Sequence, residues 1–157
     1  RAPASAGATM MDADKIKADT LVLIQILTAG IVLYLGLQRT VGLFIILIVV
    51  CGLGIMLISV LTMKLSNFRV SPIPKTDARL VTSGIYKYIR HPIYTGLLVA
   101  VLGFAINAEN AIAYILWIIL AADLITKIRF EEALLAKQFT EYAEYKKRTK
   151  RLVPFVW

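Results

Sequence analysis

The chain has 157 residues, 59% of them hydrophobic, and its mean hydropathy is +0.73. Its formal net charge of +8 could suggest nucleic acid, but the basic residues gather in two segments beside apolar runs, which favours contact with anionic lipid headgroups. The composition excludes an ordinary soluble domain and indicates a single integral membrane domain with no nucleic-acid partner.

The first half of the chain contains two apolar spans. Residues 1–11 are small, polar and aperiodic, so we expect a cloning remnant or a disordered N-terminus there and assign the membrane domain to residues 12–157. The first span covers about residues 20–38. The second, residues 41–63, has no charge and is long enough to cross about 30 Å of hydrocarbon at about 1.5 Å per residue. The short connector predicts that the second span returns antiparallel beside the first.

The second half contains two shorter spans. The third begins at a proline and covers about residues 92–107, and the fourth covers about residues 111–126. From Lys127 onward the pattern is helical and amphipathic. The expected fold class is therefore all-α, an integral membrane bundle of about four transmembrane helices with a cytoplasmic C-terminal amphipathic segment.

Small residues predict where these spans pack closely, because a side chain without bulk lets another backbone approach. In the second span these residues are Gly42, Gly52 and Gly54. In the third span, steps of four, three and four place on one helical face Gly96, Ala100, Gly103 and Asn107.

Basic residues crowd residues 64–92 and the segment after Lys127, whereas the loops on the opposite side carry Arg39 alone. By the positive-inside rule, both termini and the central segment are expected in the cytoplasm. The membrane would be the inner membrane in a bacterium or the endoplasmic reticulum in a eukaryote.

The central segment, residues 80–96 (LVTSGIYKYIRHPIYTG), is polar, aromatic and basic, and it holds the only histidine, His91. A plain connector between helices needs none of these features, so we expect a reaction site where membrane meets water. A lone histidine near a membrane surface is more often structural than catalytic. With one histidine and one cysteine in the chain, no nitrogen and sulfur ligand set is available, and no metal is expected.

A second polar cluster follows the fourth span and begins with Glu131 and Glu132. Adjacent helical residues point about 100° apart, so the two acids cannot do the same job. One could face a cofactor while the other pairs with Lys127 or Arg129. A solvated helix held by ion pairs is the alternative for this segment.

Taken together, the two clusters resemble the isoprenylcysteine carboxyl methyltransferase family, membrane enzymes that use S-adenosylmethionine. The resemblance covers about half of the chain and rests on the following stretches: LVTSGIY (80–86), RHPIYTG (90–96), the pair Glu131-Glu132, YAEYKKR (142–148) and Pro154-Phe155. The chain departs from the family pattern at Lys150, where members often have proline.

The resemblance implies an S-adenosylmethionine-dependent methyltransferase acting on a lipid-linked acceptor, most simply a carboxylate such as that of an isoprenylcysteine-like molecule. It implies that the cofactor is bound by Val81, Gly84, Tyr86, His91, Pro92, Tyr94, Gly96, Glu131 and Glu132. A carboxylate acceptor needs no base but needs a cation to orient it, and the two candidates are Arg90, then Arg148.

Three other functions stay open on the sequence. A phospholipid or amine N-methyltransferase would need a base, which His91 or a glutamate could supply. A membrane reductase would bind a nicotinamide cofactor. A non-catalytic membrane protein would use the basic segments only to hold lipid headgroups.

Overall fold

The computed structural model describes residues 4–63, 70–73 and 79–154 of the chain, and its regular elements are all helical. They are, in chain order, α1 (Ala4–Leu37), α2 (Leu43–Met63), the short 3-10 helix η1 (Gly84–Lys87), α3 (Pro92–Ala108), α4 (Ala111–Gln138) and α5 (Tyr142–Arg148). Part of the basic central segment, Pro74 and Phe155 lie outside the described residues.

Three of these helices are long and apolar enough to cross a membrane, namely α1 from Asp12 onward, α2 and α4, and the shorter α3 is also apolar. Large apolar side chains cover their outer surfaces. Leu43 is 72% exposed and Ile118 is 60% exposed, as expected where lipid rather than water surrounds a helix. The predicted all-α membrane bundle is confirmed.

The helix boundaries follow local sequence. Pro92 opens α3 at its first turn, where a proline loses no helical hydrogen bond, and the Asn110 side chain caps α4 by accepting from the Ile112 amide. α4 continues to Gln138, well beyond the expected end of the fourth span near residue 126. One continuous helix therefore carries both the apolar span and the acidic pair.

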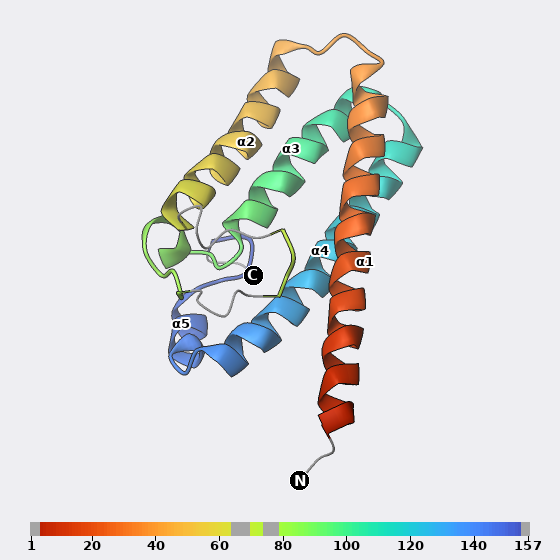
Figure 1. Ribbon diagram of the computed structural model, residues 1–157. Coiled ribbons are helices and arrows are strands. Elements are labelled where there is room, and N and C mark those ends of the chain that lie inside the picture. The colour runs from red at the N-terminus through yellow and green to blue at the C-terminus, as the bar shows by residue number, and fades with distance from the viewer. Residues whose placement is uncertain (1–3, 64–69, 74–78, 155–157) are drawn as a thin grey trace.

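The helices pack around α3. α2 packs against α3, while α1 packs against both α3 and α4 (Figure 1). The expectation that the second span lies beside the first is therefore wrong, because the described parts of α1 and α2 both meet α3 instead. The buried core lies among α1, α3 and α4 and consists of Val32, Val101, Ala105, Ala108, Ala113, Leu120 and Leu124.

A close backbone approach explains why α2 chooses α3. A Cβ atom added at Gly52 would lie 2.5 Å from the Ala100 amide nitrogen, and one added at Gly96 would lie 2.5 Å from the Gly52 carbonyl oxygen. These contacts, with that of Gly103 against Ile48 and Val49, confirm the predicted seam for Gly96, Ala100 and Gly103. Asn107 instead donates to the Gly36 carbonyl on α1. Of the three glycines expected to act in the second span, only Gly52 does so, since added Cβ atoms at Gly42 and Gly54 would meet nothing within 4 Å.

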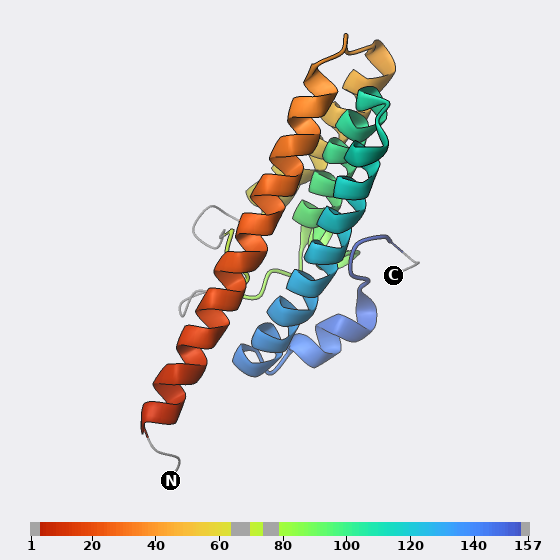
Figure 2. The ribbon, with the colours of Figure 1, turned by 90° about the vertical axis from the view of Figure 1, so that its right-hand side faces the viewer.

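The two loops α1–α2 and α3–α4 lie at one end of the bundle, and η1, α5 and the N-terminus of α1 extend toward the other (Figures 1 and 2). At this second end the chain after α5 runs beside residues 88–91. The Lys150 amide donates to the Tyr88 carbonyl at 3.1 Å, the Arg90 amide to the Lys150 carbonyl at 2.8 Å, and the His91 amide to the Arg151 carbonyl at 3.0 Å. This parallel pairing joins the two polar clusters predicted from the sequence.

Candidate functional site

A cavity of about 250 Å³ opens between the helices at this end. Its wall combines apolar side chains from α2 and α3, including Met56, Ile93 and Leu97, with polar side chains from η1, α4 and α5. Helices that face lipid and segments that face water thus enclose one space, which is the place predicted for a reaction site.

Six of the residues predicted for the site line this cavity: Val81, Tyr86, Arg90, His91, Tyr94 and Glu131. They come from residues 81–94 and from α4, segments that are well separated in the sequence. The histidine and the acidic pair, which the resemblance assigns to one cofactor site, lie together: His91 is 3.8 Å from Glu131 and 3.5 Å from Glu132.

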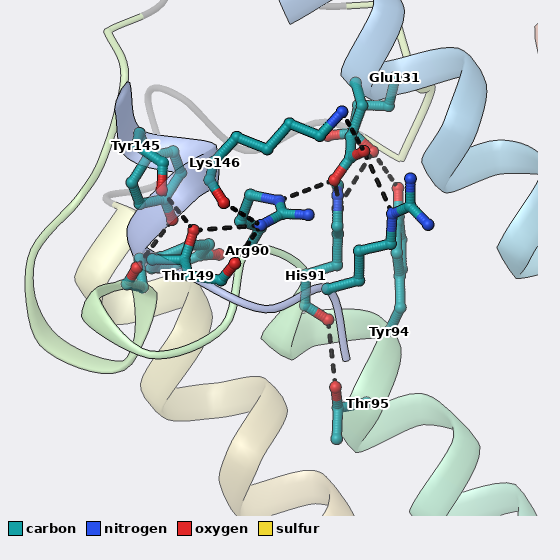
Figure 3. A network of polar contacts seen from close by, with 11 residues as sticks. Arg90, His91, Tyr94, Thr95, Glu131, Tyr145, Lys146 and Thr149 are labelled. Carbon is teal, nitrogen blue, oxygen red and sulfur yellow. Dashed lines mark hydrogen bonds and ion pairs between the residues drawn. The ribbon is translucent and has the colours of Figure 1, made fainter. Parts of the chain in front are cut away.

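Arg90 is the hub of the polar contacts in Figure 3 and is only 9% exposed. Its Nε donates to Glu132 Oε1 at 2.7 Å, and its Nη1 donates to the Lys146 carbonyl at 3.2 Å and to the carbonyl and side-chain oxygens of Thr149. The guanidinium therefore ties the start of α3 to α4 and to the end of α5. Nε and Nη1 thus donate to groups of the protein, and only Nη2 of the guanidinium could donate to a ligand.

Glu132 is the acid that pairs. Its Oε1 accepts from Arg90, and its Oε2 accepts from Arg151 Nε at 3.2 Å, with Lys146 Nζ 4.0 Å away. The expectation that one acid would pair with Lys127 or Arg129 is wrong in its partners, because Glu132 is 5% exposed and turned toward the C-terminal segment. The cations around it favour its ionised form.

Glu131 faces the cavity instead. Its Oε2 accepts a hydrogen bond from the Tyr94 hydroxyl at 2.8 Å, and its side chain is 23% exposed. The His91 ring stacks on the Tyr94 ring with centroids 5.5 Å apart and planes 5° from parallel (Figure 3). His91, Tyr94 and Glu131 thus form one polar wall of the cavity, and the two adjacent acids face different surroundings, as their helical positions require.

Three tyrosines complete the water-facing side of the cavity. The Tyr145 hydroxyl donates to the Tyr86 carbonyl at 2.7 Å, whereas the buried hydroxyls of Tyr86 and Tyr142 have no hydrogen-bond partner among the described residues. Burial raises the pKa of all three phenols above its ordinary value. All three remain protonated at neutral pH, and the hydroxyls of Tyr86 and Tyr142 can donate to a polar ligand.

The other predicted residues lie away from the cavity wall. Pro92 is buried at the start of α3, and Gly96 belongs to the α2–α3 contact. Gly84 has a positive φ of 56° and lies against Thr62, so this turn requires a glycine. Arg148 is exposed on α5 and lines a separate depression together with Lys87 and Thr149.

Several polar residues of the cavity wall were not among the predicted site residues. They are Gln25 on α1, Ser71 and Arg79 in the central segment, Lys127 on α4, and Tyr142 and Tyr145 on α5. Lys127 was considered only as an ion-pair partner for an acid. Two features of the sequence could have pointed to Gln25 and Lys127. Gln25 is a polar residue within an apolar span, and Lys127 comes four residues before Glu131; polar groups inside a membrane protein usually face its interior.

The sequence profile of the isoprenylcysteine carboxyl methyltransferase family matches residues 43–137. This stretch is more than half of the chain and contains α2, α3, nearly all of α4 and the His91, Tyr94 and Glu131 wall. The chain belongs to the isoprenylcysteine carboxyl methyltransferase family. The resemblance seen in the sequence is therefore confirmed.

Similar proteins include two named for this activity. The chain is 34% identical over 82 residues to a protein-S-isoprenylcysteine O-methyltransferase of Schizosaccharomyces pombe, covering 51% of this chain and 35% of that protein. It is 37% identical over 84 residues to protein-S-isoprenylcysteine O-methyltransferase B of Arabidopsis thaliana, covering 50% and 41%.

A third relative has a different name. The cobalt-zinc-cadmium resistance protein CzcN of Cupriavidus metallidurans is 40% identical over 76 residues, covering 48% of this chain and 35% of that protein. The chain thus spans between 35% and 41% of the length of these three relatives.

Proposed function

We propose that the chain is an integral membrane methyltransferase that uses S-adenosylmethionine to methylate a lipid-linked carboxylate. The observation that carries the proposal is the shared cavity wall of His91, Tyr94 and Glu131, built from two distant segments inside the region that matches the family. A solvated helix or a headgroup-binding surface would need no such enclosed arrangement.

The residues present suit this cofactor. S-adenosylmethionine, when bound, would supply a methyl group on a positively charged sulfur. The Glu131 carboxylate could accept from its amino or ribose groups, and the unpartnered hydroxyls of Tyr86 and Tyr142 could donate to its polar atoms. Aromatic rings attract cations, and Tyr86, Tyr142 and Tyr145 also line the cavity. Val81 would close the wall from the central segment.

The chain's own work in this reaction is positioning. A new bond forms between a carboxylate oxygen and the methyl carbon while the carbon–sulfur bond breaks, so no proton moves and no general base is required. Holding the two reactants at near-attack distance can supply roughly 7–11 kcal/mol in good cases. The rigid contacts of Arg90 with Glu132 and Thr149 would keep the cavity wall in place for this purpose.

Arg90 was predicted to be the cation that orients the acceptor, but its contacts with the protein limit how much of it could bind a ligand. Its Nε and Nη1 are engaged with protein acceptors, so only Nη2 remains for a ligand. Arg148, the second candidate, would have to move from its exposed position on α5 to reach the cavity.

The apolar wall of Met56, Ile93 and Leu97 suits a lipophilic acceptor that enters sideways between helices, while the cofactor enters from the water-facing end. We propose that this end is cytoplasmic, because Lys87 of η1 and the basic residues of α5 (Lys146, Lys147 and Arg148) lie there.

A methyl-transfer assay tests the proposal. The purified protein in detergent would be given S-adenosylmethionine with a radiolabelled methyl group and N-acetyl-S-farnesylcysteine as the acid probe. We expect a labelled product that releases methanol in mild alkali, as an ester does. A labelled, alkali-stable product from an amine lipid would instead support the N-methyltransferase alternative, and no transfer to either would contradict the proposal.

A further inference from the structure

Lys127 is a buried cation that lines the cavity and has no role in the proposed reaction as described above. Its side chain is 0% exposed, and it lies on α4 one helical turn before Glu131, toward the middle of the bundle. Its Nζ donates to Gln25 Oε1 on α1 at 2.6 Å and lies 5.2 Å from the centre of the Tyr94 ring.

The ammonium group of Lys127 is incompletely satisfied. An ammonium has three donors, and the contact with Gln25 is its only hydrogen bond among the described residues. Asp123 and Glu131, one turn before and one turn after Lys127 on α4, both attract its charge. Neither is found to accept a hydrogen bond from Nζ, since both Asp123 oxygens lack a partner among the described residues and Glu131 Oε2 accepts from Tyr94. A buried charge is costly unless it is paired.

We propose that Lys127, held by Gln25, is the positioning residue that binds the carboxylate of the lipid acceptor. The inference rests on the proposed function and adds the residue that selects an acid. Lys127 lines the same cavity as the apolar side chains of Met56 and Leu97, so a lipid that enters between the helices would bring its headgroup into the space that Lys127 faces. In Arg90, by contrast, Nε and Nη1 already donate hydrogen bonds to Glu132, Lys146 and Thr149.

This assignment predicts discrimination between substrate and product. The acid carries a negative charge that Lys127 can pair with, whereas the methyl ester is neutral. A hydrogen bond to a charged group inside a protein makes the acid bind about tenfold to a hundredfold more tightly than the ester. The loss of this contact on methylation would favour release of the ester.

The test measures binding of N-acetyl-S-farnesylcysteine and of its methyl ester to the full chain in detergent, with S-adenosylhomocysteine present to prevent turnover. Lys127→Met should reduce the preference for acid over ester to within about threefold, mainly by weakening the acid. Lys127→Arg should keep the preference, because the positive charge remains. Lys147→Met, at an exposed lysine of α5 paired with Glu144, is the matched control and should behave as wild type.

Gln25→Glu is a second variant of nearly the same shape. It places a carboxylate beside the ammonium and should also reduce the preference for the acid, so it decides the question if Lys127→Met does not fold. S-adenosylmethionine itself contains a carboxylate, which is the other source of this chemistry. Calorimetry of its binding to the same variants separates the two, and we expect a change of less than about threefold.

A preserved acid preference in folded Lys127→Met, or in Gln25→Glu where the first variant does not fold, would overturn the assignment. Loss of S-adenosylmethionine affinity with an unchanged acid-to-ester ratio would assign the carboxylate to the methyl donor and overturn it too. In both cases wild type would still bind the donor and the acid. Failure of wild type to bind either would instead count against the proposed function and the inference together.

Discussion

Glu131 and Glu132 are neighbours in the sequence with unlike surroundings, and single substitutions should separate them. Glu131→Gln should weaken S-adenosylmethionine binding about tenfold or more, at the scale of one lost charged hydrogen bond, and should leave thermal stability close to wild type. Glu132→Gln should destabilise the fold, because breaking a buried ion pair costs about 3–5 kcal/mol. Calorimetry and thermal unfolding in detergent are the two measurements.

The substitutions are matched in size and chemistry, so each serves as the control for the other. Equal loss of affinity and of stability in both variants would contradict the division of roles between the cavity wall and the ion-pair cluster of Arg90, Glu132 and Arg151.

Tyr142 allows a pH prediction at the same scale. Burial raises the pKa of its phenol in the folded protein above the ordinary value near 10. Its neutral form therefore contributes stability that is fully present below about pH 10 and is lost as the pH rises through the folded-state pKa. Tyr142→Phe should lose little stability at pH 7, since the hydroxyl has no partner among the described residues, and should lessen the loss of stability at alkaline pH.

Circular dichroism of detergent samples between pH 7 and 12 measures this effect, with Tyr88→Phe as the control because Tyr88 is 54% exposed. The account would be wrong about Tyr142 if both variants followed the wild-type curve throughout.

At the scale of elements, the contact between α2 and α3 sets the position of His91 and Tyr94 at the start of α3. Gly52→Ala should disturb it, since the added Cβ atom would lie 2.5 Å from the Ala100 backbone. Overpacking of this kind typically costs 1–3 kcal/mol, so we expect lower thermal stability and weaker cofactor binding. Gly54→Ala on the same helix is the control, because its Cβ atom would meet nothing within 4 Å.

A Gly52→Ala protein as stable as Gly54→Ala would show that the two backbones have room to separate. The seam would then not be what holds the cavity wall in place.

The apolar spans could be predicted because apolar length and composition fix them locally, but the extension of α1 back to Ala4 and the continuation of α4 to Gln138 as one helix could not. Pro92 predicted where α3 begins, and the small residues along α3 predicted which of its faces packs against another helix. The order of packing could not be predicted, since a short connector suggests that α2 lies beside α1, and only the backbone fit of Gly52 with Gly96 shows the preference for α3.

The polar half of the site was harder to derive from sequence. The meeting of His91 with the acids was implied by the family resemblance, but the parallel pairing of residues 88–91 with the chain after α5 could not be predicted. It depends on backbone hydrogen bonds between segments far apart in sequence, which leave no side-chain pattern. That pairing brings Thr149 and Lys146 within hydrogen-bonding distance of Arg90. These hydrogen bonds leave fewer Arg90 donors for an acceptor carboxylate than the sequence predicted.

At the scale of the whole molecule, the arrangement of the ends predicts a membrane orientation. The α1–α2 and α3–α4 loops lie at one end and α5 at the other (Figure 1). In a background with Cys51 replaced by serine, a cysteine at Arg39 should react in intact cells with a maleimide that cannot cross membranes. A cysteine at Lys147 should react only after the membrane is opened; both side chains are more than half exposed.

The reverse pattern of labelling would place the cavity on the non-cytoplasmic side and contradict the proposed orientation. Labelling of both positions in intact cells would contradict the separation of the two ends by a membrane.

The central claim is that the cavity formed by η1, α3, α4 and α5 binds the methyl donor. Calorimetric titration of the purified protein in detergent with S-adenosylmethionine, S-adenosylhomocysteine and a reduced nicotinamide dinucleotide tests it most directly. We expect saturable binding of the first two ligands, weakened in Glu131→Gln, and none of the third. Binding of the nicotinamide alone, or of no ligand at all, would contradict the account.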